Sequence, residues 1–225
     1  MRLSKLLLIS LGMLIFSGCV SMPTPHNYDA FHNADPNSIL VLPPINNTTE
    51  VIAPYSVLSQ VSLPISESGY YVFPVAVVEQ TFKSNGLTIA NDVHAVPIQK
   101  LREIFGADAA LYMTINEYGT SYAVIASETR VTIEATLVDL RTGTVLWKDT
   151  ATASSAETRS SNSGGIIGLL VEAAISQIVE TVVDAGYDIS RITTTRLLSA
   201  DLHNGLLYGP RSPKYKHKNI AEQSK

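Results

Sequence analysis

The stretch Arg130-Val-Thr-Ile-Glu-Ala-Thr-Leu137 alternates strictly between polar and apolar side chains. One side carries the apolar set Val131, Ile133, Ala135 and Leu137. A period of two is typical of an antiparallel strand with one face on a core and the other in water. The connection Asp139-Leu-Arg-Thr-Gly143 follows, in which the glycine is free to take positive φ, and Thr144–Thr150 is expected to return as the partner strand.

Upstream of this hairpin the sequence predicts further strands and two helices. Leu111–Asn116 also alternates, which makes it the third strand of an antiparallel meander. Two short apolar runs, Ser38–Leu42 and Tyr70–Phe73, are expected as strands, and proline and glycine delimit helices at Pro74–Gly86 and Pro97–Gly106. The predicted fold class is mixed α/β (α+β). It is a single domain in which a mixed sheet ends in a three-stranded antiparallel meander, with helices packed on it.

The remaining segments are a capping loop, a linker and two C-terminal helices. Asn46–Thr49 offers N-caps to the segment after it, and Ala153–Gly165, rich in Ser, Thr and Gly, is expected to be a mobile loop. Ile166–Ala185 is predicted to be a helix that packs on the core, with one polar stripe made of Glu172, Ser176, Glu180 and Asp184. Carboxylates in mid-segment would be costly in lipid, which argues against a membrane span. Asp188 is expected to cap a final helix that reaches about His203.

Length and composition describe one globular domain with additional segments at its ends. The chain has 225 residues, 45% of them hydrophobic, which is enough to bury a substantial core. Its single cysteine excludes an intramolecular disulfide and a zinc site built on cysteine pairs. Residues 19–208 hold nine Lys and Arg against nineteen Asp and Glu, a net charge of −10 that argues against nucleic-acid binding.

Residues 1–18 have the features of a signal peptide. Arg2 and Lys5 precede the apolar run Leu6–Phe16, which is too short to span a bilayer. The run leads into Phe16-Ser-Gly-Cys19, which resembles the lipobox of bacterial lipoproteins, so Cys19 is the residue expected to be lipidated. A plain secretory signal with an incidental cysteine is the alternative. Val20 stands where Asp usually retains a lipoprotein in the inner membrane, and the sorting rule of that class implies an outer-membrane protein whose domain faces the periplasm.

The domain boundaries follow from these segments. Residues 19–37, with Pro23, Pro25 and Pro36 and no apolar periodicity, are predicted to be a lipidated tether. Residues 38–208 form the predicted globular domain. Residues 209–225 hold five cations against one Glu and are predicted to be a disordered basic tail. Such a tail either contacts anionic lipid headgroups, lipopolysaccharide phosphates or an acidic partner, or serves only solubility.

The sequence shows no catalytic, cofactor-binding or metal-binding constellation. It lacks a nucleophile elbow, a phosphate-binding loop and a dinucleotide-binding turn. No metal-ligand spacing joins the histidines at His26, His32, His94, His203 and His217. Asp184 and Asp188 are better explained as solvated helix-end carboxylates than as an acid–base pair, and Gly164-Gly165-x-x-Gly168 as a flexible joint than as an anion cradle. If the adjacent Tyr70 and Tyr71 lie on a strand, one faces the core and the other could serve an interface, although core packing is the better expectation for each. The sequence thus predicts a protein that is not an enzyme.

Several stretches resemble a family of small bacterial lipoproteins of unassigned function that includes a neisserial vaccine-candidate antigen. They are the lipobox, Val41-Leu-Pro-Pro-Ile-Asn-Asn-Thr48, Gly69-Tyr-Tyr-Val-Phe-Pro74, Gly106-Ala-Asp-Ala-Ala110 with Tyr112, and Val138-Asp-Leu-Arg-Thr-Gly-Thr-Val-Leu-Trp147. The similarity covers nearly the whole mature chain to about Tyr208. CsgG-like lipoproteins and the Lpo activators of peptidoglycan synthases show turns similar to the last stretch. The resemblance implies a fold like the N-terminal domain of the periplasmic protein TolB, no catalytic residues, and companion lipoproteins of which one is CsgG-like.

The expected function is a non-enzymatic accessory or scaffold in cell-envelope assembly, transport or secretion that works through protein–protein contacts. Expected partners are the membrane through the N-terminal lipid, the companion lipoproteins and a second copy in a homodimer. A sheet edge or the exposed face of the Ile166–Ala185 helix is the expected contact surface. The alternative is a CsgG-like secretion pore component that inserts the apolar segment Val51–Val78. Pro54, Pro64 and Pro74 argue against insertion as strands, because proline lacks the ladder donor.

Overall fold

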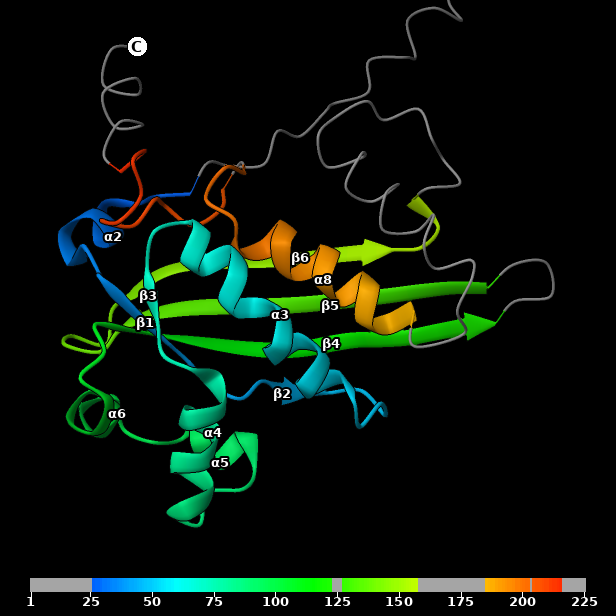
Figure 1. Cartoon of the computed structure of the whole chain (residues 1–225), viewed down its shortest axis with the longest axis horizontal. Coiled ribbons are helices and arrows are strands. Elements are labelled where there is room, and N and C mark those ends of the chain that lie inside the picture. Colours follow the sequence, from blue (N-terminus) through cyan, green and yellow to red (C-terminus); the bar gives the residue numbers. More distant parts are fainter. Residues whose placement is uncertain (1–25, 123–126, 158–184, 203, 216–225) are drawn as a thin grey trace, which may run out of the picture.

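The strands of the computed structural model, which describes residues 26–122, 127–157, 185–202 and 204–215, form one six-stranded sheet (Figure 1). The spatial order is β3-β1-β4-β5-β6, and β2 pairs with β4 beyond the end of β1. In chain order the strands are β1 (Ser38–Val41), β2 (Ile45–Asn46), β3 (Tyr71–Val72), β4 (Ala109–Tyr122), β5 (Ser127–Asp139) and β6 (Val145–Ser154).

The sheet is mixed, as the sequence predicts. β1 runs parallel to both neighbours, with Ile39 opposite Val72 of β3 and Ala109 of β4. β4, β5 and β6 are antiparallel, and Leu137 of β5 lies between Leu111 and Trp147. This arrangement confirms the predicted mixed sheet that ends in a three-stranded antiparallel meander.

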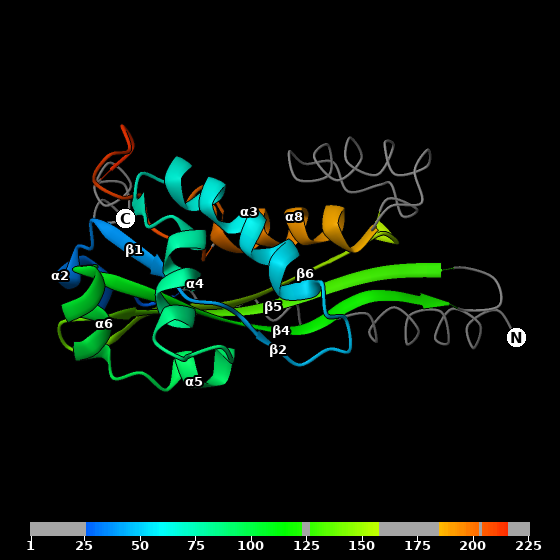
Figure 2. The same ribbon diagram turned by 60° about the horizontal axis from the view of Figure 1, so that its bottom comes forward.

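Helices cover the two faces of the sheet unequally. One face carries α3 (Ala53–Glu67) and α8 (Ala185–Leu198) side by side, and the other carries α4 (Val75–Ser84), α5 (Ala90–His94) and α6 (Ile98–Phe105) (Figure 2). β1 is buried on both sides, because Ile39 and Val41 face the α3–α8 layer while Leu40 and Leu42 face the α4–α6 layer. Burial on both faces explains why this strand is a continuous apolar run rather than an alternating one.

The alternating stretch behaves as its period requires. Val131, Ile133, Ala135 and Leu137 are all fully buried, while the polar residues between them are half-buried or exposed. Trp147 is buried as well, and its indole N–H donates to the carbonyl of Asn204 at 2.8 Å. The predicted helices after Pro74 and Pro97 are present as α4 and α6, and Gly106 ends α6 with φ 67°.

Residues 51–78, the candidate for membrane insertion, form α3, β3 and the start of α4. Val57, Val61 and Ile65 of α3 are fully buried against the sheet. Pro54 lies in the first turn of the helix, where its missing N–H costs little, and Pro64 lies inside it. In this structure the segment is a helical part of the core.

Two predicted boundaries are wrong where the chain packs on itself. Residues 26–37, predicted to be tether, include α2 (Asp29–Ala34), whose Phe31 and Ala34 enter the core. Residues 209–215, predicted to be disordered tail, pack on the connection between α3 and β3. A six-residue helix shows too little periodicity for sequence reasoning, and the other segment is ordered by distant contacts. Residues 19–25 and 216–225 lie outside the described residues.

The C-terminal helices are described only in part. The final helix is α8, which covers 185–198 rather than 188–203, and Asp188 lies in its first turn rather than at its cap. β6 extends to Ser154, into the predicted loop. Residues 158–184, with the rest of that loop and nearly all of the predicted 166–185 helix, lie outside the described part. None of the described helices is long and apolar enough to cross a bilayer.

Candidate functional site: the C-terminal strap and the exposed face of α3

The two adjacent tyrosines point to opposite sides. α3 ends at Glu67, and Gly69 turns the chain with φ 98° toward β3. Tyr70 then enters the core with 4% of its surface exposed, while Tyr71 remains 45% exposed. Core packing, the expectation for each tyrosine, holds for Tyr70 and is wrong for Tyr71, which takes the exposed position that strand geometry allowed for one of the pair.

Residues 205–215, here called the C-terminal strap, cross over this turn. Gly209 N–H donates to the Ser68 carbonyl at 2.8 Å, and Arg211 N–H donates to the Gly69 carbonyl at 3.1 Å. The backbones approach so closely that a Cβ on Gly209 would lie 2.6 Å from the Gly69 oxygen. Glycine at both positions therefore permits the crossing.

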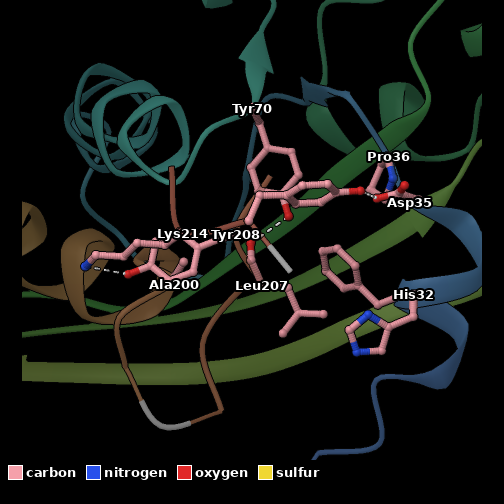
Figure 3. Close-up of a pocket in the computed structure, with 10 residues that line it drawn as sticks. His32, Asp35, Pro36, Tyr70, Ala200, Leu207, Tyr208 and Lys214 are labelled. Carbon is pink, nitrogen blue, oxygen red and sulfur yellow. Dashed lines mark hydrogen bonds between the residues drawn. The ribbon is translucent and has the colours of Figure 1, made fainter. Parts of the chain in front are cut away.

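A small pocket opens where the strap meets α2 and Tyr70 (Figure 3). Tyr70 donates its hydroxyl to the Leu207 carbonyl at 2.6 Å, and Tyr215 donates to Asp35, which takes the left-handed conformation (φ 42°) at the end of α2. Asp201 accepts from both Tyr208 and Lys214, the latter at 2.9 Å. The pocket is lined by Phe31, His32, Asp35, Pro36, Tyr70, Ala200, Leu207, Tyr208, Lys214 and Tyr215.

The electrostatics of the pocket keep the Tyr70 phenol neutral. Burial raises the pKa of Tyr70 far above its usual value, and the nearby Asp35 and Tyr215 raise it further. A neutral phenol can donate a hydrogen bond but is a poor base or nucleophile at ordinary pH. Asp35 and Asp201 are both engaged by tyrosine hydroxyls. The pocket is thus suited to structural hydrogen bonding and contact rather than to proton transfer.

α3 presents an exposed face with little charge, on which Glu67 in the last turn is the one charged residue of the helix. From residue 51 to residue 66 the sequence contains no Asp, Glu, Lys or Arg. Tyr55 is 54% exposed and Leu63 is 65% exposed, with Ile52 beside them and Val77 of α4 60% exposed. Depletion of charge together with exposed aromatic and aliphatic side chains is characteristic of the centre of protein–protein interfaces. The sequence signal for this face was the charge-free stretch, with Ile52, Tyr55 and Leu63 on the side opposite Val57, Val61 and Ile65.

The outer edge of β6 is closed by side chains. His26 bonds the carbonyl of Lys148 through Nε2, and Arg196 of α8 donates to the carbonyl of Thr152. Thr150 N–H donates to Asp149 Oδ1 at 2.8 Å, and Ser154 N–H donates to Glu157 Oε1 at 3.0 Å. Four of the backbone groups that could pair with a new strand are thereby occupied. Of the two expected contact surfaces, this sheet edge is partly protected, and the 166–185 helix lies outside the described residues except for Ala185.

The other residues singled out by sequence are dispersed. His32 lines the pocket. His94 lies elsewhere, with its ring packed edge-on against Tyr112 and its Nε2 hydrogen-bonded to the Pro43 carbonyl at 2.9 Å. Cys19, His203, His217, Asp184 and Gly164–Gly168 lie outside the described residues. Within the described ranges, no three His, Cys, Asp or Glu side chains gather as metal ligands would. Sequence reasoning missed Asp35, Tyr208, Lys214 and Tyr215, because their grouping depends on contacts between distant parts of the chain.

A family model named GNA1162-like, which describes lipoproteins, matches residues 26–211. The chain belongs to the GNA1162-like lipoprotein family. The GNA1162-like match begins just before α2, in the predicted tether, and ends at residue 211, just inside the predicted tail.

Individual relatives agree with this assignment. A lipoprotein of Neisseria meningitidis serogroup B, NMB1124/NMB1162, is 46% identical over 201 residues, which are 89% of this chain and 93% of the relative. The crystal structure of lipoprotein GNA1162 from Neisseria meningitidis has 48% identity and a TM-score of 0.53, and covers 65% of this chain and 100% of its own. The LpoB C-terminal domain from Escherichia coli has 16% identity and a TM-score of 0.34, covering 53% and 84% of the two chains, too little to support an inference. The mixed α+β fold is therefore that of a GNA1162-like lipoprotein.

Proposed function

We propose that this GNA1162-like protein is an outer-membrane lipoprotein, anchored through Cys19, whose domain faces the periplasm. It acts there as a non-enzymatic accessory or scaffold in cell-envelope assembly, transport or secretion, through contacts with companion lipoproteins, one of them CsgG-like, or with a second copy. Family membership supports the lipid anchor. Recruitment at a membrane needs only modest affinity, because anchoring both molecules raises their effective concentration.

The observation that carries the proposal is the apolar, charge-poor exposed face of α3. An exposed helix face is ordinarily rich in Lys and Glu, whereas this one offers Tyr55, Leu63 and Ile52. Tyrosine is enriched among the residues that contribute most of the binding energy at interfaces. The pore alternative would require residues 51–78 to leave the core, where Val57, Val61 and Ile65 are fully buried.

Photo-crosslinking in intact cells tests the proposal. A photoreactive residue replaces Tyr55 in the full chain, and the control places the same residue at Ile104, which is 54% exposed on α6. We expect the probe at Tyr55 to capture a lipoprotein or a second copy of the chain, identified by mass spectrometry, and Leu63→Ser to abolish that capture. The control should capture neither.

Equal capture from the two positions, or none from Tyr55, would show that α3 is not the contact surface. Circular dichroism of each variant keeps a folding defect distinct from a lost contact. Hydrolysis of an envelope substrate by the purified protein would contradict a non-enzymatic role.

A further inference from the structure

The two ends of the described chain meet at one end of the sheet. His26 N–H donates to Asn204 Oδ1 at 3.3 Å, and the Tyr28 hydroxyl donates to the Gly205 carbonyl at 2.6 Å. The strap therefore begins where the chain enters the domain, and α2 and the strap lie together at that end (Figure 1).

The distance from this entry point to the proposed anchor is short. Only residues 20–25 separate Cys19 from His26. Seven steps along the chain span at most about 25 Å even when fully extended. Lipidation at Cys19, on which this step rests, would thus hold the strap end of the domain close to the membrane surface.

Charge favours the same orientation. Residues 209–225 carry a net charge of +4, whereas residues 19–208 carry −10. Arg211 and Lys214 of the strap are exposed, and they stand 5.6 Å and 5.2 Å from the ring centres of Tyr71 and Tyr208. Tyrosine and basic residues together are typical of surfaces at the membrane–water boundary.

The acidic groups nearby are mostly engaged. Asp201 holds Lys214 and Tyr208, and Asp35 accepts from Tyr215. Asp29 of α2 is exposed outside these pairs. The two exposed cations of the strap thus stand beside three carboxylates, of which Asp35 and Asp201 are engaged and Asp29 is exposed.

We propose that the strap is the membrane-facing surface of the protein and docks on anionic phospholipid headgroups, with Arg211 and Lys214 as its contact cations. Attraction of the basic end and repulsion of the acidic body both orient the domain on a negative leaflet. β4 has fourteen residues and extends roughly 45 Å from this end, so the far end of the β4–β5 hairpin points away from the lipid.

Orientation can be measured on the full chain after lipidation and reconstitution into vesicles. With Cys19 acylated, an introduced cysteine is the only thiol to label, so a fluorophore is placed at Pro213→Cys in the strap or, as control, at Ser121→Cys near the far end of β4. Both positions are exposed. In vesicles containing phosphatidylglycerol, a headgroup-attached quencher should quench the strap probe strongly and the control weakly. In pure phosphatidylcholine the difference should shrink, as it should at high salt.

Charge variants test the named cations. Arg211→Gln with Lys214→Gln should reduce the equilibrium between docked and undocked domain by about fivefold for each cation. Lys83→Gln with Lys100→Gln removes the same charge from exposed positions on α4 and α6 and should leave strap quenching unchanged.

Equal quenching of the two probes, or equal effects of the two double variants, would overturn the proposal. So would strap variants that abolish capture of a protein partner while leaving vesicle orientation intact. A chain that fails to incorporate into vesicles at all would refute the Cys19 anchor, which is a failure of the proposed function and not of the charge argument.

Discussion

Gly69 and Gly86 adopt similar positive φ values, 98° and 81°, but their surroundings differ. A Cβ on Gly69 would lie 2.5 Å from the Ser212 nitrogen and 2.8 Å from the Gly209 oxygen. A Cβ on Gly86 would meet nothing within 4 Å. An alanine at Gly86 therefore measures the energetic cost of a left-handed backbone alone, whereas an alanine at Gly69 adds the cost of displacing the strap.

We expect Gly86→Ala to destabilise the protein by about 1–2 kcal/mol, the cost of placing a Cβ in the left-handed region. Gly69→Ala should cost about 1–3 kcal/mol more, because backbone atoms of the strap must move away. Urea unfolding of both variants measures the difference. Equal losses of stability in the two variants would mean that the strap can move away from residue 69 at no cost in free energy.

His94 gives the folded protein a pH dependence. Burial lowers its pKa below the ordinary value of 6.5, and the hydrogen bond to the Pro43 carbonyl opposes that shift. As pH falls through about 6.5, the unfolded chain takes up the proton before the native one, so stability decreases toward the lowered native pKa.

The free energy of unfolding should therefore decline between neutral pH and about pH 5 in the native protein, and less steeply in His94→Gln. Parallel slopes for the native protein and His94→Gln would show that this histidine does not couple protonation to folding.

At the scale of single elements, β5 separates core from surface. Ile133 is fully buried, whereas Thr132 is half-buried and its hydroxyl bonds Glu117 at 2.5 Å and Thr152 at 2.9 Å. Ile133→Ala should destabilise the protein by about 2–5 kcal/mol, and Thr132→Ala by about 1 kcal/mol. Thermal and urea unfolding measure the loss of stability in the two variants. Similar losses would mean that both faces of the strand are equally buried.

The edge of β6 yields a prediction about association. Arg196→Ala removes the donor on the Thr152 carbonyl and the ion pair with Glu157 at 2.8 Å, which together close one end of this edge. We expect the variant to associate more strongly than the native protein, in a concentration-dependent way, by sedimentation velocity. Arg191→Ala, an exposed arginine on the same helix, should behave as the native protein. Unchanged sedimentation of Arg196→Ala would show that the edge is protected by other means.

Sequence periodicity predicts elements whose formation depends on local sequence signals. The alternation of Val131 to Leu137 and the Pro and Gly signals around α4 and α6 are local, so those elements are found where expected. α2 and the strap depend instead on contacts such as Tyr28 with Gly205, separated by 177 positions. No local window contains that information, and for this reason the tether and the tail were both predicted too long.

The candidate site divides in the same way. The opposite placement of Tyr70 and Tyr71 follows from strand geometry and could be predicted. The charge-free stretch 51–66 was visible in composition, but the exposure of one face of α3 depended on which side the sheet covers. The pocket joins residues from α2, the turn after α3 and the strap, and only the folded chain brings them together.

At the scale of the whole molecule, anchoring and folding should be separable. The described core starts at Phe31, twelve positions after Cys19. Cys19→Ala should therefore abolish incorporation of radiolabelled palmitate and release the protein from the outer-membrane fraction, while its unfolding transition stays within about 0.5 kcal/mol of the native one. Palmitate incorporation into the variant would show that the acyl group is attached elsewhere.

The meeting of the two chain ends also sets the order in which the domain can be completed. A polypeptide emerges from a ribosome or a translocation channel with its N-terminus first, so Ser68 and Tyr70 are outside well before residues 205–215. The Ser68 hydroxyl and carbonyl oxygens can accept their hydrogen bonds from the Ala200 and Gly209 N–H groups only after those residues have also emerged. The last native contacts therefore form only after the whole domain has emerged. A chain that ends before residue 205 would lack the contact from Gly209, which would leave the turn after α3 open to proteases.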